Sequence, residues 1–228
     1  MSMRSENVAR RILVINPNSN PAVSDGIRRA AAGAVCADTE LTVVNTTHGP
    51  FSIETLEHRA QTIAPLLALV ESYRDKGFDA CVLGCYDDIA LEDIRQRLDI
   101  PVVSTVEASI MAASTVSTRF CVVTTVHSAL PAINGLLQAY GVQHLASAVA
   151  AGIGVDEAAA GAQATEHKLN LAMQAAIEQH GAEAIVLGSG GLAGRAPALA
   201  KAFNLPVIDA VLSAINWAEE LAKQHGQT

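Results

Sequence analysis

The pattern of apolar and polar positions predicts short strands that alternate with helices along most of the chain. Runs of apolar residues, such as RILVIN (11–16) and DACVLGC (79–85), are separated by longer stretches that are rich in alanine. Strands that are apolar throughout and alternate with helices are typical of a parallel sheet covered by helices on both faces. The helices predicted in the first half run from Pro21 to about Val35, from about Glu57 to Lys76, and from near Ala90 to Leu98.

This series of strands and helices occurs twice. Three pairs of segments match in the same order: GFDACVLGC (77–85) with GAEAIVLGS (181–189), IPVVSTVEASI (100–110) with LPVIDAVLSAI (205–215), and RRILVINPNSN (10–20) with TRFCVVTTVHS (118–128). Repeated segments indicate a repeated structural unit. We therefore expect an α/β fold of two similar lobes, each a parallel sheet flanked by helices, related by a pseudo-twofold axis.

The division of the chain between the lobes follows from the repeat. We expect residues 1–103 in the first lobe, with the C-terminal segment 206–228 returning to it, and residues 104–205 in the second lobe. Ligands of such folds bind in a crevice at the carboxyl ends of the strands. The active site is therefore expected in the crevice between the lobes.

Composition and charge restrict the possible partners. Half of the residues are apolar, which is sufficient for a substantial core, and the formal net charge is -8 without a block of basic residues. A nucleic-acid binder needs a basic surface, so this class is excluded. The first apolar run is too short for a signal peptide or a membrane span, so we expect a cytoplasmic protein that acts on a small molecule.

The four cysteines differ in their predicted environments. None forms a CxxC pair or lies in a His/Cys cluster, so we expect neither a metal site nor a disulfide framework. Cys81 and Cys121 fall inside predicted strands and are assigned to the core. Cys85 instead follows a strand directly, and Ser189 occupies the same place in the second repeat.

Cys85 and Ser189 are therefore predicted to face each other across the crevice. We expect each to lie at the amino end of the next helix, where free N–H groups and the helix dipole stabilise an anion and lower the pKa of a thiol. This position favours a catalytic role for Cys85. The alternative is that Cys85 is a buried core cysteine like the other two.

Seven segments in this order resemble one known family. They are VINPNS (14–19), GPFSIE (49–54), GCYDDIAL (84–91), IPVVSTVEA (100–108), RFCVVTT (119–125), IVLGSGGLAG (185–194) and LPVIDAV (205–211). Over nearly the whole chain they resemble the hydantoin and allantoin racemase branch of the aspartate/glutamate racemase superfamily. The resemblance implies a cofactor-independent racemase, often a homo-oligomer, in which two cysteines exchange a proton with opposite faces of a carbon next to a carbonyl.

The sequence departs from the family pattern at Ser189, where the family has its second cysteine. Ser189 is either an inactivating cysteine-to-serine substitution or the natural residue of a relative with one-sided chemistry. The family-like residues on both sides of it favour the first explanation. In either case racemisation is expected to be impaired, because a serine hydroxyl accepts a proton only with the help of a neighbouring base.

Further residues are expected to bind the substrate. The backbone N–H groups of Tyr86, Asp87, Gly190 and Gly191 are candidates for stabilising an enolate. The resemblance implies that Asn16, Thr124 and Thr125 contact carbonyl and N–H groups, and that Pro50 and Ser52 line the pocket. Asn20 is assigned a structural role instead, as the N-cap of the helix that starts at Pro21.

Two other functions compete with a hydantoin-type racemase. One is a single-thiol decarboxylase or cis-trans isomerase of the same superfold. The other is a binding protein without chemistry, because two-lobed α/β folds also serve as ligand receptors.

Overall fold

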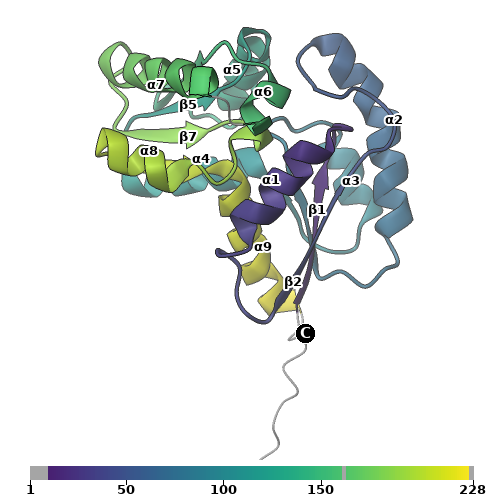
Figure 1. Cartoon of the computed structure of the whole chain (residues 1–228). Helices are drawn as coiled ribbons and strands as arrows, with labels where there is room; N and C mark the ends of the chain where they lie inside the picture. The colour runs from purple at the N-terminus through teal and green to yellow at the C-terminus, as the bar shows by residue number, and fades with distance from the viewer. Residues whose placement is uncertain (1–9, 161–162, 226–228) are drawn as a thin grey trace, which may run out of the picture.

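The computed structural model describes residues 10–160 and 163–225, and it contains two parallel sheets (Figure 1). The first sheet has the order β2-β1-β3-β4 and the second the order β6-β5-β7-β8. The strands of the first are β1 (Arg10–Asn16), β2 (Thr39–Asn45), β3 (Ala80–Leu83) and β4 (Val102–Ser104). Those of the second are β5 (Phe120–Thr124), β6 (Ala146–Ala150), β7 (Ala184–Leu187) and β8 (Val207–Asp209). The shared strand order confirms the predicted α/β fold of two similar lobes.

The apolar strands are buried because each sheet is covered on both faces. Side chains alternate between the faces of a strand, so Ile12 and Val14 of β1 point to one side and Leu13 and Ile15 to the other. One face of the first sheet is covered by α1 (Pro21–Ala31) and α9 (Ala210–His225). The other face is covered by α2 (Leu56–Tyr73) and α3 (Leu91–Arg97). The second sheet lies between α6 (Val155–Ala160), α7 (Gln163–Glu178) and α8 (Ala196–Phe203) on one face and α4 (Thr105–Val116) and α5 (Leu130–Ala139) on the other.

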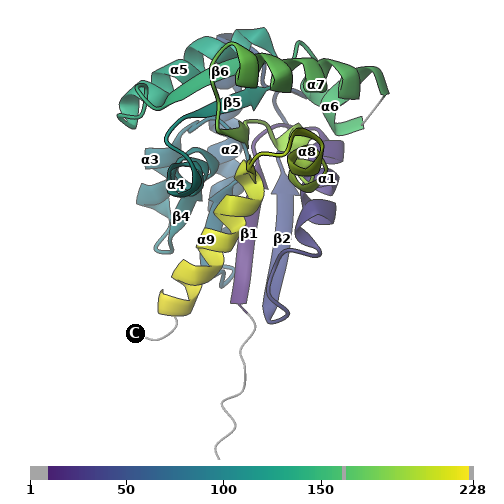
Figure 2. The same cartoon turned by 90° about the vertical axis from the view of Figure 1, so that its left-hand side faces the viewer.

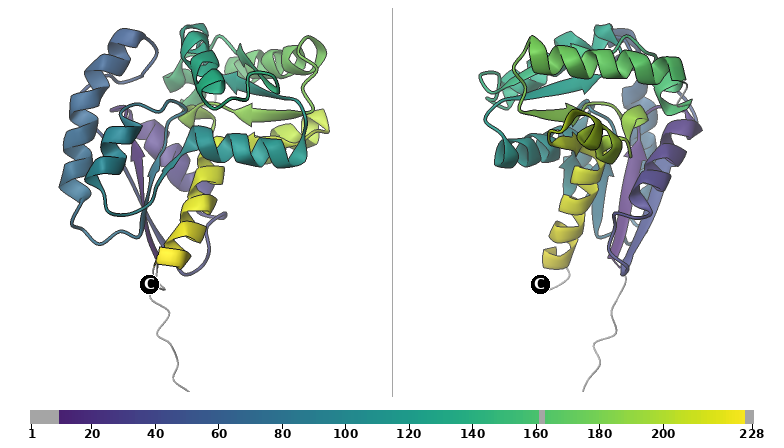
Figure 3. Two further views of the ribbon diagram at one scale, coloured as in Figure 1. Left: turned by 180° about the vertical axis from the view of Figure 1, so that it is seen from behind. Right: turned by 60° about the vertical axis from the view of Figure 1, so that its left-hand side comes forward.

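Two helices cross between the lobes. Helix α4 follows β4 of the first sheet but buries Val106 and Ile110 against the second sheet. Helix α9 follows β8 of the second sheet but buries Val211 and Ile215 against the first. The two helices lie side by side (Figure 3), and Figure 2 shows α9 in yellow beside β1, on the face of the first sheet where it also contacts β3 and β4. Within the segment 206–228, β8 therefore belongs to the second sheet, and the return to the first lobe begins with α9.

The helix ends show which local signals the sequence carries. Asn20 caps α1 as predicted, because its side chain accepts from the Ala22 N–H at 3.0 Å and Pro21 follows at the first helical position. Helix α1 ends at Ala31, before the predicted Val35, where a turn containing Gly33 follows. No helix in residues 10–160 and 163–225 combines the length and the apolar character that crossing a membrane requires.

Candidate active site

The turns after β3 and β7 are built alike. The N–H of Gly84 donates to the Ile15 carbonyl, and the N–H of Gly188 donates to the Val123 carbonyl, both at 2.9 Å. An added Cβ would lie 2.4 Å from a Val122 methyl at Gly188, which leaves no room for a side chain there, and 3.2 Å from a Val14 methyl at Gly84, a tight contact. Cys85 and Ser189 follow these glycines and so occupy equivalent places.

One pocket between the lobes contains both residues. Of the predicted site residues, it is lined by Cys85, Tyr86, Asp87, Thr124, Thr125, Ser189 and Gly190. The two turns lie close together, since a Cβ on Gly190 would be 3.0 Å from the Gly84 carbonyl oxygen. The structure thus brings together the two residues that the repeat placed opposite each other.

Asn16 lies beneath the pocket rather than on its wall. It is fully buried, and its side-chain amide donates toward Asn18 Oδ1, the Asn20 carbonyl and Ser24 Oγ at 3.0–3.3 Å. These bonds hold the turn that connects β1 to α1. Asn18, two residues further along, lines the pocket instead, so the predicted substrate contact of Asn16 is not supported by its placement.

The other predicted residues outside the pocket wall are Pro50, Ser52 and Gly191. The Pro50 carbonyl accepts from the Ser19 N–H at 3.0 Å. In this segment of the chain, the first residue that lines the pocket is Ile53, directly after Ser52. Gly191 faces α6, since an added Cβ would lie 2.8 Å from the Val155 carbonyl oxygen. Its N–H donates to Ser189 Oγ at 3.3 Å, so this group orients Ser189 rather than pointing to a ligand.

Several pocket residues were not singled out as substrate contacts from the sequence. They include Asn18, Ile53, Glu54, Leu56, Arg59 and Ser128. The segment 53–59 brings most of them over the pocket from the start of α2. The GPFSIE motif did mark this region, but nothing in the sequence indicated which of its side chains turn inward.

Cys85 has a different environment from the one predicted. Helix α3 begins only at Leu91, so Cys85 does not lie at the amino end of that helix. Ser189 does cap a short 3₁₀ helix, η2 (Gly190–Leu192). Burial raises the pKa of the Cys85 thiol well above its usual range, Asp87 and Asp88 raise it further, and Arg59 opposes them. The expected lowering of this pKa is therefore wrong, because desolvation and two nearby carboxylates outweigh the nearby guanidinium.

A bidentate ion pair lies beside Cys85 on the pocket wall. Arg59 donates from Nε to one oxygen of Asp87 at 2.5 Å and from Nη2 to the other at 2.7 Å. The bond to Asp87 raises the pKa of Arg59, while burial raises the pKa of Asp87 and Arg59 opposes that shift. The pair fixes the segment from α2 against the Cys85 turn.

Tyr86 anchors the same turn in the other lobe. Its side chain packs among residues of the second lobe, including Phe120 and Val122, and only 6% of it is exposed. Its hydroxyl is the one buried side-chain polar atom without a hydrogen-bond partner among the residues described. Burial raises the pKa of Tyr86 above its usual range, so the hydroxyl stays protonated.

Hydrogen bonds within and between the lobes fix the Cys85 turn further. Asp88 accepts from Ser104 Oγ at the end of β4 at 2.5 Å, and from the hydroxyl of Tyr140, which follows α5, at 2.6 Å. Thr105 Oγ1 donates to the Cys85 carbonyl at 2.6 Å. In the described part of the chain the N–H groups of Tyr86, Asp87 and Gly190 make no hydrogen bond, which leaves them available as donors. No group of three or more His, Cys, Asp or Glu side chains in that part is arranged to hold a metal ion.

The fold matches that of solved racemase structures. The allantoin racemase from Klebsiella pneumoniae is 32% identical, with a TM-score of 0.90 over 94% of this chain and 88% of that chain. The allantoin racemase from Pseudomonas fluorescens is 29% identical, with a TM-score of 0.88 over 94% of this chain and 91% of that chain. The hydantoin racemase of Pseudomonas sp. (strain NS671) is 33% identical over 212 residues, which are 92% of this chain and 85% of that protein.

A family model described as Asp/Glu/Hydantoin racemase matches residues 12–218. The chain belongs to this family, and the resemblance seen in the sequence is confirmed.

Proposed function

We propose that this protein is a racemase of a five-membered cyclic ureide of the hydantoin or allantoin type. The observation that carries the proposal is the placement of Cys85 and Ser189, on equivalent turns of two similar lobes, in one pocket. Inversion of a carbon through a planar intermediate needs proton-transfer groups on both faces. Two lobes that present equivalent turns to one pocket meet this need. The hydantoin and allantoin racemases among the relatives support the choice of substrate.

In this mechanism Cys85 exchanges a proton with one face of the carbon next to the carbonyl. The enolate that forms is stabilised by the free N–H groups of Tyr86, Asp87 and Gly190. Asn18, Thr124 and Thr125 line the same pocket and supply polar groups for the ring carbonyls and N–H groups. The raised pKa of Cys85 favours its thiol form, which donates a proton to the enolate in one direction, and the thiolate left by that step accepts a proton in the other direction.

Ser189 makes the second half of the exchange slow. Its hydroxyl oxygen accepts the Gly191 N–H, which orients it without making it a base. We therefore propose a racemase whose inversion is impaired on the Ser189 face.

The test is the optical rotation of enantiopure 5-substituted hydantoins and of allantoin incubated with the purified protein. Loss of rotation above the uncatalysed rate, in both directions, is the expected result. Release of carbon dioxide from a malonate-type acid without racemisation would instead favour the single-thiol decarboxylase. Binding without turnover of any of these compounds would favour a receptor.

A further inference from the structure

The pocket contains one carboxylate that the mechanism above does not use. Its ionisable residues are Glu54, Arg59, Cys85, Tyr86 and Asp87. Asp87 is held by both of its oxygens to Arg59, and the Tyr86 ring is packed into the second lobe. Glu54 is therefore the acidic group of this pocket that remains for proton transfer opposite Cys85.

Glu54 belongs to the first lobe but is fixed to the second. Its Oε1 accepts from the Val155 N–H at 3.1 Å, and its backbone carbonyl accepts from the Ser128 hydroxyl. Val155 in turn packs on the turn that carries Ser189, since its carbonyl oxygen is 2.8 Å from the place of a Cβ on Gly191. These contacts place the Glu54 carboxylate on the Ser189 side of the pocket.

We propose that Glu54 is the second proton-transfer group of this racemase, in place of the thiol that Ser189 lacks. The proposal rests on the proposed racemase function. Glu54 Oε2 makes no hydrogen bond with any residue the structure describes, so this oxygen is free to accept a proton. The Ser189 hydroxyl, which accepts from Gly191, keeps its own proton to donate to the enolate oxygen.

The proton balance is complete without another reactant. The Glu54 carboxylate takes the proton from the carbon and becomes a carboxylic acid, while the electron pair of the broken C–H bond forms the enolate. The Cys85 thiol then donates its proton to the opposite face and becomes a thiolate. The reverse reaction, or proton exchange with water, restores the starting forms.

The experiment compares Glu54→Gln in two backgrounds, the present chain and the Ser189→Cys chain. Glutamine keeps an oxygen that accepts the Val155 N–H but cannot take a proton at neutral pH. In the present chain we expect Glu54→Gln to lower racemisation by about 100-fold or more. In the Ser189→Cys chain the same change is expected to have little effect, because the new thiol does the proton transfer.

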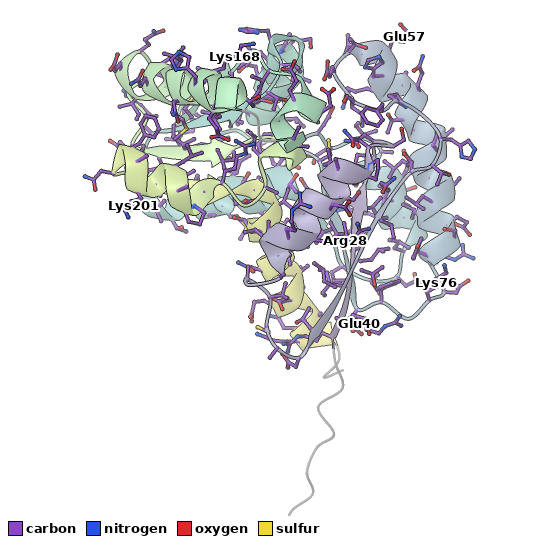
Figure 4. The ribbon with its side chains drawn as sticks, in the orientation of Figure 1. Arg28, Glu40, Glu57, Lys76, Lys168 and Lys201 are labelled. Atoms are coloured by element: carbon purple, nitrogen blue, oxygen red, sulfur yellow. The ribbon has the colours of Figure 1, made fainter. Side chains whose placement is uncertain are left out.

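Glu57→Gln is the matched control, since Glu57 is exposed in the first turn of α2 and Figure 4 labels it at the outer end of that helix. Glu57→Gln should leave the racemisation rate unchanged in both backgrounds. Deuterium incorporation gives a second readout. Glu54→Gln should stop exchange of the enantiomer whose hydrogen faces Ser189, while exchange at the Cys85 face continues.

Equal losses from Glu54→Gln in the two backgrounds would show that Glu54 only supports the fold, and would overturn the inference. Racemisation in the present chain that is unaffected by Glu54→Gln would also overturn it, while leaving the racemase function intact. Absence of racemisation in every chain, including Ser189→Cys, would overturn the racemase function and the inference together.

Discussion

The turns that carry Cys85 and Ser189 are held by equivalent backbone hydrogen bonds, at Gly84 and Gly188, but they contact the other lobe differently. After Cys85, the chain sends the Tyr86 side chain into the core of the second lobe. After Ser189, Gly190 has no side chain and its backbone lies against the Gly84 carbonyl of the first lobe, where an added Cβ would lie at 3.0 Å. The equivalent turns therefore fix the positions of Cys85 and Ser189, while the residues that follow each of them determine its surroundings.

The charges on the two turns differ as well. Asp87 and Asp88 stand two and three residues after Cys85, whereas the uncharged Gly191 and Leu192 hold the same places after Ser189. The carboxylates work against a thiolate at Cys85, and Arg59 reduces their effect. Equivalent turns thus give the Cys85 and Ser189 side chains different electrostatic surroundings.

The largest effect is expected from removing the thiol. Cys85→Ala should abolish solvent deuterium exchange of the enantiomer whose hydrogen faces Cys85, a loss of about 1,000- to 10,000-fold, because the neighbouring carboxylate, Asp87, is held by both oxygens to Arg59. Proton NMR in deuterated water measures this exchange for each enantiomer. The exposed Cys36, changed to alanine, is the control. Exchange that persists without Cys85 would contradict its role.

Ser189→Cys should make the two turns chemically equivalent. We expect racemisation to rise by about 100- to 10,000-fold, because the new thiol is a far better proton acceptor than a hydroxyl. Polarimetry on a hydantoin substrate checks this, with Ser189→Ala as the companion variant that adds no thiol. Equal rates for the Cys variant and the present chain would rule out a two-thiol mechanism for this pocket.

Changes at the ion pair should move the pKa of Cys85 in opposite directions. Asp87→Asn removes a charge that raises this pKa, so it should lower it; Arg59→Gln removes a charge that lowers it, so it should raise it further. We expect shifts of about one pH unit, because charges near a protein surface interact through an intermediate dielectric. The rate of Cys85 alkylation against pH, followed by mass spectrometry of its peptide, measures them. Shifts of the same sign would contradict the assignment of these charges.

The smallest effect is expected on stability, when the glycines that precede Cys85 and Ser189 are changed to alanine. Gly188→Ala should lower the free energy of unfolding by about 1–3 kcal/mol, because its Cβ would lie 2.4 Å from a Val122 methyl. Gly84→Ala should cost less, since the nearest methyl is at 3.2 Å. Urea unfolding of the two variants gives both values. A larger loss of unfolding free energy for Gly84→Ala than for Gly188→Ala would mean that the two turns are not packed as described.

Local patterns in the sequence predicted much of the fold and part of the site. The apolar runs marked β1, β3 and β4 of the first sheet and β5, β7 and β8 of the second, but not β6. Asn20 and Pro21 marked the start of α1, and Cys81 and Cys121 are buried as predicted. The placement of Asn16 could not be predicted in this way. Asn16 is the last residue of β1 and Asn18 comes two residues later, and only the packing of the β1–α1 turn decides that Asn18 reaches the pocket.

The sequence by itself determined that two similar α/β lobes form and that Cys85 and Ser189 stand at equivalent strand ends. Both properties can be predicted from short segments, because strands, turns and the repeat depend on residues that are close in sequence. Only the tertiary structure decided that Glu54 and Arg59 enter the pocket, that α4 and α9 cross between the lobes, and that the pKa of Cys85 is raised. These properties depend on burial and on contacts between residues far apart in the chain, and electrostatic effects of this kind act through distance in space.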